Sequence, residues 1–262
     1  MRLFAILPLI CYIVALSTTA AAQSPAPITI MTYNIHHGAD AHEIDTHTSM
    51  AATINHAAPD FVGLQEVDRG VGRSHRVDQV QRLAQLTGMT PAYGEHFPYG
   101  GGSYGNAILS RHPITSVTIH RITSPRSDGT TRSLAFPVIT ATLPGGQPVV
   151  MSTVHLALSQ PDRLLQVREI LNHLKETTGP VILTGDMNAL PHTPEILLHK
   201  EHFTDTDPAD QFTFPVNPPV RKIDYILISK PHLKHTIRHQ VLTDIHASDH
   251  LPAIATIHIT TP

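Results

Sequence analysis

Short polar motifs that carry Asn, Glu, His and Asp recur along this chain, most of them at or next to the end of an apolar stretch. Such side chains, if they converge on one edge of a fold, supply the oxygen ligands of a hard divalent cation and the groups needed for in-line attack on phosphorus. Taken singly the motifs are weak, because an Asp or His near a strand end is more often a cap or a surface group. The motifs are TYNIHHG from Thr32, LQEVD from Leu64, YGNAILSRHPI from Tyr104, STVHL from Ser152, LTGDMNALP from Leu183, KIDYILIS from Lys222 and ASDHLPA from Ala247.

The elements that must position these motifs are predicted as an alternation of strands and helices. Helices are expected over Glu43–Ala57, from a cap at Ser74 to Thr87, over Pro161–Glu176, and from Thr193 for a short stretch. Strands are expected over Ile28–Ile35, Phe61–Leu64, Ala107–Ser110, Val117–Ile122, Phe136–Leu143, Val149–His155, Val181–Thr184, Ile223–Ser229, Ile237–Leu242 and Ala253–Ile259. The segment Phe97–Gly105, FPYGGGSYG, is predicted to be a flexible loop because its glycines permit positive φ.

Taken together and in this order, the motifs resemble those of the endonuclease/exonuclease/phosphatase family. That family includes DNase I-like nucleases, abasic-site endonucleases, inositol-polyphosphate phosphatases and bacterial sphingomyelinases. The resemblance runs from about Ile28 to Thr260 and implies a four-layer α/β sandwich, in which helices flank two packed mixed β-sheets. Periodicity alone indicates only the mixture of strands and helices. Residues 28–262 are expected to form a single domain of this kind.

The resemblance also implies a role for individual side chains. The expected ligands of a Mg²⁺ or Mn²⁺ ion are Asn34, Glu66 and Asp249. His250 is expected to act as general base on water, with Asp224 steadying its imidazole. The remaining side chains are expected around the scissile phosphate: His155, Asp186 and Asn188 as catalytic groups, and Asn106 and Arg132 as phosphate contacts.

These roles together predict hydrolysis of a phosphodiester by a metal- and His-activated water, without a covalent enzyme intermediate. The substrate stays open between a nucleic acid, a lipid headgroup and a small phosphodiester. Lys and Arg number 18 against 21 Asp and Glu, for a net charge of −3, whereas a dedicated nucleic-acid binder usually has a basic face. The chain also has no Trp to wall an abasic pocket. The alternative outside the enzyme class is a binding module on the same scaffold.

The N-terminus reads as a secretory signal peptide over residues 1–22, followed by a short leader over residues 23–27. Arg2 supplies the positive start, Leu3 to Leu16 is an almost unbroken apolar run, and small residues follow at Thr19 to Ala22. The only cysteine, Cys11, would be removed with this segment. The sequence therefore predicts a secreted or periplasmic monomer without disulfides and without a stable membrane span.

Overall fold

Successive side chains of a strand point to opposite faces of the sheet. In this protein both faces of the sheets are buried, so the molecule is built in layers. The computed structural model describes residues 26–260. Its twelve strands form two sheets of six, with the orders β11-β12-β1-β2-β4-β3 and β5-β6-β7-β8-β10-β9. The strands are β1 (Ile28–Asn34), β2 (Phe61–Arg69), β3 (Thr90–Tyr99), β4 (Gly102–Ser110), β5 (Ile114–Pro125), β6 (Thr131–Thr142), β7 (Pro148–His155), β8 (Val181–Asp186), β9 (Phe203–Asp205), β10 (Asp224–Ser229), β11 (Leu233–Val241) and β12 (Ala253–Ile259). The helices are α1 (His47–Ala57), α2 (Gln79–Thr87), α3 (Gln160–Leu174) and α4 (Pro194–His202), with the short 3₁₀ turns η1 (His36–Gly38) and η2 (Lys230–His232).

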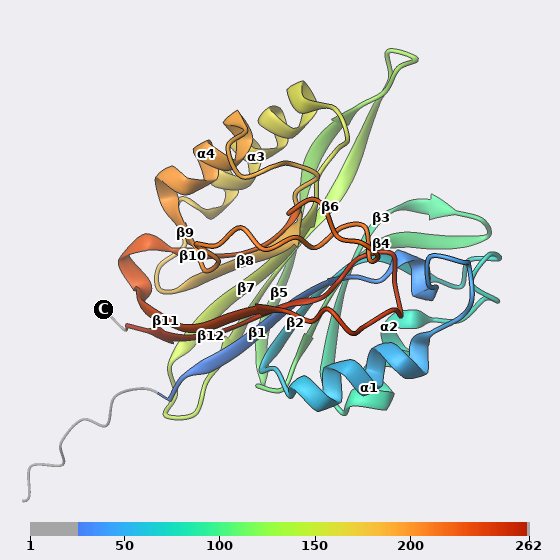
Figure 1. Ribbon diagram of the computed structural model, residues 1–262. Helices are drawn as coiled ribbons and strands as arrows, with labels where there is room; N and C mark the ends of the chain where they lie inside the picture. The colour runs from blue at the N-terminus through green and yellow to red at the C-terminus, as the bar shows by residue number, and fades with distance from the viewer. Residues whose placement is uncertain (1–25, 261–262) are drawn as a thin grey trace, which may run out of the picture.

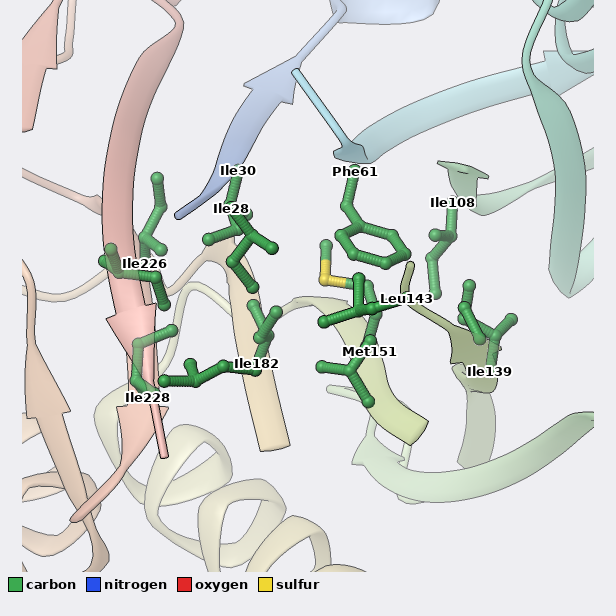
Figure 2. Close-up of a cluster of buried hydrophobic side chains, with 14 of the residues drawn as sticks. Ile28, Ile30, Phe61, Ile108, Ile139, Leu143, Met151, Ile182, Ile226 and Ile228 are labelled. Atoms are coloured by element: carbon green, nitrogen blue, oxygen red, sulfur yellow. The ribbon is translucent and has the colours of Figure 1, made fainter. Parts of the chain in front are cut away.

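The two sheets pack face to face, and helices cover their outer faces (Figure 1). Isoleucines and other apolar side chains from both sheets meet in the central layer, where Ile30 and Phe61 of one sheet face Met151 and Ile182 of the other (Figure 2). Helices α1 and α2 pack on the outer face of the first sheet, and α3 and α4 on that of the second. The expected four-layer α/β sandwich is confirmed.

The alternation along each central strand also determines where polar groups gather. In β1, Ile28 and Ile30 point into the layer between the sheets, so Thr32 and Asn34 continue the same face toward the strand end. In β8, Ile182 is likewise followed on its face by Thr184 and then Asp186 at the end of the strand. The layer between the sheets therefore changes from apolar residues to threonines and then to carboxylate and carboxamide groups at one edge.

The sheets are in close contact just below that edge. A Cβ atom at Gly63 of β2 would lie 2.1 Å from Thr184 Oγ1 and 2.8 Å from Thr153 Oγ1, both on the other sheet. Beside this contact, Gln65 Nε2 donates hydrogen bonds to Thr153 Oγ1 at 2.6 Å and to Thr32 Oγ1 at 3.3 Å. These buried polar contacts join the two sheets directly beneath the edge where the motifs end.

The predicted flexible loop at Phe97–Gly105 is wrong, because these residues belong to the paired strands β3 and β4. Tyr99 lies opposite Gly102, and only Gly100 and Gly101 make the turn, both with positive φ. Further along, a Cβ atom at Gly105 would lie 2.1 Å from the carbonyl oxygen of Gly94. Glycine at position 105 therefore allows close approach of the two strands, whereas the glycine-rich composition alone predicts a flexible segment.

Two helix starts also differ from the sequence-based expectation. Helix α1 begins at His47 instead of Glu43, because Asp40 closes a preceding turn by accepting the Ile44 N–H at 3.0 Å. Helix α2 begins at Gln79, capped by Asp78, while the Ser74 hydroxyl instead donates to the Val71 carbonyl. Within residues 26–260, no helix is long and apolar enough to cross a membrane. The predicted signal peptide and most of the leader lie outside the described residues.

Candidate active site

The ends of four neighbouring strands bring the expected catalytic residues to one edge of the second sheet and the adjoining end of β1. His155 and Asp186 are the last residues of the parallel strands β7 and β8 and lie opposite each other. Asp224 is the first residue of β10 and lies opposite Asp186 in the antiparallel pairing. Asn34 ends β1 on the facing sheet and reaches Asp186 Oδ2 through its Nδ2 at 3.1 Å. We call this group of side chains, together with Glu66 and His250, the rim.

An Asp–His pair forms the buried part of the rim. His250 Nδ1 lies 2.9 Å from Asp224 Oδ2, and both side chains are almost fully buried. The backbone N–H of His250 donates to the Ser248 hydroxyl, which in turn donates to the Asn34 carbonyl at 2.8 Å. Burial acts to lower the pKa of His250, but the neighbouring carboxylates of Asp224 and Asp186 outweigh it and raise this pKa to about 10. The imidazole is thus strongly basic, and its Nε2 faces Asp186 at 3.6 Å.

Asp186 is the centre of the contacts within the rim. Its Oδ1 accepts the Asn188 backbone N–H at 2.8 Å, and its Oδ2 lies 3.5 Å from His155 Nε2. Burial and the nearby charge of Asp224 raise the pKa of Asp186. Two carboxylates so close in a buried place need a shared proton or a positive group between them, and the imidazole of His250, which contacts both Asp186 and Asp224, can supply it.

Glu66 reaches the rim from the other sheet through an irregularity of its strand. The β2–β4 pairing shifts between Leu64 and Val67, and Glu66 in this bulge has a φ of +59°. Asn34 Nδ2 donates to Glu66 Oε1 at 3.1 Å. Although burial opposes it, the positive charge of His155 and the Asn34 hydrogen bond lower the pKa of Glu66. Glu66 is therefore held as an anion beside Asn34, which also contacts Asp186.

Asn106 lies on β4 opposite this bulge. The residues before and after Asn106 in β4 pair with β2 on the two sides of the bulge, Gly105 with Val67 and Ala107 with Leu64. The Asn106 carboxamide is fully buried, and neither its nitrogen nor its oxygen makes a hydrogen bond of normal geometry with the described residues. Buried amides are normally paired, and the polar neighbour of this one is His96: burial lowers the pKa of His96, and a hydrogen bond with Asn106 opposes that effect.

The expected metal ligands lie around the end of β1 and have the donor chemistry that a hard cation needs. Glu66 is anionic and lies against Asn34, and Asp249 follows Ser248, which is bonded to the Asn34 backbone. The Asn34 side-chain oxygen accepts the His36 N–H at 3.0 Å, so its N–H₂ group faces the carboxylates. At the rim, the side chains whose ligand atoms all lie within 4.8 Å of one another are Asp186, Asp224 and His250. Ligation of a Mg²⁺ or Mn²⁺ ion by Asn34, Glu66 and Asp249 stays a prediction.

Two other expected residues are placed less centrally. Asn188 has a φ of +48° and donates from Nδ2 to the Leu156 carbonyl at 2.8 Å, which fixes its amide next to Asp186. Arg132 lies exposed on β6, with its guanidinium 4.5 Å from the ring centre of Phe97 on β3. Arg132 thus contacts the neighbouring hairpin, and no ion pair joins it to the rim within the described residues.

Sequence reasoning missed Phe214, whose ring centre lies 4.6 Å from that of His250. Phe214 comes from the segment between β9 and β10, and no motif indicated that this segment folds back over the imidazole. Gln65, which joins the two sheets beneath the rim, was also missed. Its position beside Glu66 in the LQEVD motif was the one signal that could have indicated it.

Comparison with known proteins agrees with this architecture. Residues 31–250 match the model of the Endonuclease/Exonuclease/phosphatase family, so the chain belongs to that family. This family acts on phosphoester substrates. The match begins within β1 and ends at His250, and it therefore includes every residue of the rim.

Individual relatives extend over nearly the whole chain. The uncharacterized protein YbhP of Escherichia coli strain K12 is 26% identical over 248 residues, which cover 88% of this chain and 96% of YbhP. The crystal structure of an endonuclease/exonuclease/phosphatase from Beutenbergia cavernae DSM 12333 is similar with a TM-score of 0.72 and 26% identity, covering 89% of this chain and 72% of that one. The mannosyl-6-phosphatase Bt3783 of Bacteroides thetaiotaomicron VPI-5482 shares the fold, with a TM-score of 0.67 and 17% identity over 88% of this chain and 99% of that one.

Proposed function

We propose that this protein is a divalent-metal-dependent phosphoesterase that hydrolyses phosphodiesters with a water molecule activated at the rim. The observation that carries the proposal is the buried pair of His250 and Asp224, 2.9 Å apart, which lies beside Asp186. Glu66 joins this group from the opposite sheet through Asn34. A base, its orienting carboxylate and an anionic oxygen ligand are thus gathered at one edge, as hydrolysis of a phosphoester requires.

The Asp224 carboxylate determines how His250 can act. Its contact with Nδ1 leaves Nε2 as the nitrogen that takes a proton from water, and its charge stabilises the imidazolium that results. Phe214 packs against the ring and limits its rotation. Glu66 and Asp249 would hold a Mg²⁺ or Mn²⁺ ion, which would supply Lewis-acid polarisation of the phosphoester and a positive charge to offset the carboxylates that raise the pKa of His250.

Other side chains of the rim would bind the phosphoryl group. The donors we propose are His155 Nε2, 3.5 Å from Asp186 Oδ2, and the amide of Asn106, which lies on β4 opposite the bulge that carries Glu66. Donors held in place before the reaction stabilise the charge that develops on phosphoryl oxygens. Asn188 keeps Asp186 in position by its backbone N–H, so that Asp186 can orient the attacking water. The predicted phosphate contact of Arg132 would require it to leave Phe97.

A lipid-headgroup phosphodiester is the substrate class that one further observation favours. Four large apolar side chains are exposed in the segments that follow β7 and β8 or precede β10. They are Leu158 (85% exposed), Leu190 (47%), Phe212 (52%) and Val220 (56%). Together with the net charge of −3, this composition suits an apolar surface better than the phosphate backbone of a nucleic acid. Secretion through the segment 1–22 would place the enzyme where such lipids are accessible.

The test is hydrolysis of a phosphoester panel by the mature protein with Mg²⁺, Mn²⁺ or EDTA. The panel holds sphingomyelin, phosphatidylinositol, plasmid DNA, RNA, bis-p-nitrophenyl phosphate and mannose 6-phosphate. Glu66→Gln and His250→Gln would be compared with Glu201→Gln and His202→Gln, which make the same changes at exposed positions of α4. We expect activity that EDTA and the two rim substitutions abolish and the two control substitutions leave intact. Activity that survives both rim substitutions would refute the assignment.

A further inference from the structure

Three titratable side chains outside the rim meet just beyond the end of β1. His36 and His37 form the 3₁₀ turn η1, and Glu43 comes from the segment between η1 and α1. The Glu43 carboxylate lies 2.9 Å from His37 Nε2 through one oxygen and 3.7 Å from His36 Nε2 through the other. One ligand atom from each of the three residues lies within 4.8 Å of the other two.

These distances agree with a tetrahedral metal centre. Ligand atoms that each lie ~2.0–2.1 Å from a zinc ion in tetrahedral geometry are roughly 3.4 Å apart. The distances of 2.9 and 3.7 Å between Glu43 oxygens and the two imidazoles lie on either side of that value. Small side-chain rotations, without movement of the backbone, would therefore bring the three donors to ligand distance.

A hydrogen bond at the edge of the cluster prepares His36 as a ligand. His36 Nδ1 lies 3.3 Å from the Asp40 carbonyl, so a proton on Nδ1 leaves Nε2 as the free lone pair facing Glu43. A metal-bound histidine typically donates its other nitrogen to a carbonyl or carboxylate in this way. Asp40 also accepts the N–H groups of His42 and Ile44, which braces the turn that carries Glu43.

The imidazole of His37 carries a second mark of a ligand site. The residue is 8% exposed, and its Nδ1 has no hydrogen-bond partner among residues 26–260. Burying a ring nitrogen without a hydrogen bond costs free energy, which another favourable interaction of the same ring must offset. The backbone agrees, because His36, His37 and Glu43 all have positive φ, at 42°, 46° and 63°. Three donors of one short segment in a conformation that non-glycine residues rarely adopt indicate a local structure shaped by more than chain packing.

We propose that His36, His37 and Glu43 bind a zinc ion beside the rim. Two imidazoles and one carboxylate are the donors that Zn²⁺ prefers, whereas Mg²⁺ prefers oxygen ligands alone. Three protein ligands leave one tetrahedral position open to water or to an oxygen of a bound phosphoester. His36 Nδ1 lies 4.0 Å from Asp249 Oδ1, so this zinc site and the expected magnesium ligands are neighbours with different metal preference.

The test is Zn²⁺ and Co²⁺ binding by the metal-free, full mature protein in the presence of saturating Mg²⁺. Zn²⁺ affinity would be measured by calorimetry, and the geometry by the visible absorption of bound Co²⁺. Variants His37→Gln and Glu43→Gln would be compared with His42→Gln, an exposed histidine of the same turn outside the cluster. Glu66→Ala would separate this site from the rim.

We expect one Zn²⁺ with intense, tetrahedral Co²⁺ absorption in the wild type, in His42→Gln and in Glu66→Ala. Affinity should fall at least 100-fold in His37→Gln and Glu43→Gln. Equal Zn²⁺ affinity in wild type and His37→Gln would overturn the proposal and leave His37–Glu43 as a structural pair. If His37→Gln does not fold, anomalous diffraction at the zinc edge from wild-type crystals decides, and a peak anywhere but between these three residues refutes the site.

Discussion

His199 of helix α4 should make the folded protein sensitive to mild acid. Its side chain is fully buried, and neither ring nitrogen has a hydrogen-bond partner among the described residues. Burial, with a smaller contribution from the charge of His202, lowers the pKa of His199 from 6.5 to about 3. Its ring instead packs edge-on against Phe203, with centres 6.3 Å apart. The folded state therefore holds His199 neutral at pH values where the unfolded chain binds a proton.

The sign and size of the effect follow from this difference in proton binding. Between pH 6.5 and about 3 the unfolded state binds more protons, so the free energy of unfolding falls as the pH falls, by roughly 1.4 kcal/mol per pH unit for one such group. At pH ~4.5 the loss from His199 is about 3 kcal/mol. His96 adds a similar loss, since burial and the charges of His155 and Arg121 lower its pKa to about 3. The combined loss from His199 and His96 is a large share of the ~5–15 kcal/mol by which a typical domain is stable against unfolding.

The assay is urea unfolding followed by circular dichroism at a series of pH values from neutral to mildly acidic. His199→Leu removes the titrating ring and keeps an apolar side chain of similar size, while His56→Leu makes the same change at an exposed position of α1. The stability curve of His199→Leu should be flatter than that of the wild type by roughly 1.4 kcal/mol per pH unit below pH ~6. The curve of His56→Leu should run parallel to the wild type. Parallel curves for all three proteins would refute the reasoning.

Three further substitutions test the packing and the chemistry around the rim. Gly63→Ala should lower the free energy of unfolding in urea by about 1–3 kcal/mol, because its Cβ would meet Thr184 Oγ1 at 2.1 Å, and adding Thr184→Ala should recover part of the loss. Lys222→Met should destabilise the fold by about 3–5 kcal/mol, since Lys222 Nζ is the buried partner of Asp205 at 2.8 Å and of Asp207 at 3.2 Å; an unchanged urea midpoint would contradict this. Asp224→Asn should lower kcat on a phosphodiester by roughly 10⁴-fold with KM nearly unchanged, and a kcat within tenfold of wild type would show that Asp224 does not orient His250.

The layered architecture could be predicted because strands and their buried faces follow local rules. The alternation that sends Ile28 and Ile30 between the sheets also sends Asn34 there, and the same parity places Asp186 after Ile182. The convergence of these two side chains therefore follows from residue order once the strands are paired. The pairing itself, and with it the choice of neighbours for each motif, came from resemblance to the family.

Features that depend on contacts distant in sequence could not be predicted. Glu66 reaches the rim through a bulge with a positive φ, and nothing in LQEVD distinguishes that backbone from a regular strand. The glycine-rich segment Phe97–Gly105 suggested a mobile loop, whereas pairing with β3 uses the missing side chain of Gly105 for close contact. Phe214 contacts His250 only because the segment before β10 folds back over the ring.

The central claim is that Glu66 of β2 and His250, in the segment before β12, act on the same phosphoryl group. A double-mutant cycle of kcat/KM with Mn²⁺, on the panel substrate that the wild type hydrolyses fastest, tests it most directly. Each of Glu66→Gln and His250→Gln should lower kcat/KM by at least ~10³-fold, and the double variant should be little worse than the weaker single variant, because groups that act as a unit are not additive. Losses that multiply in the double variant, or near wild-type activity in either single variant, would contradict a shared catalytic centre.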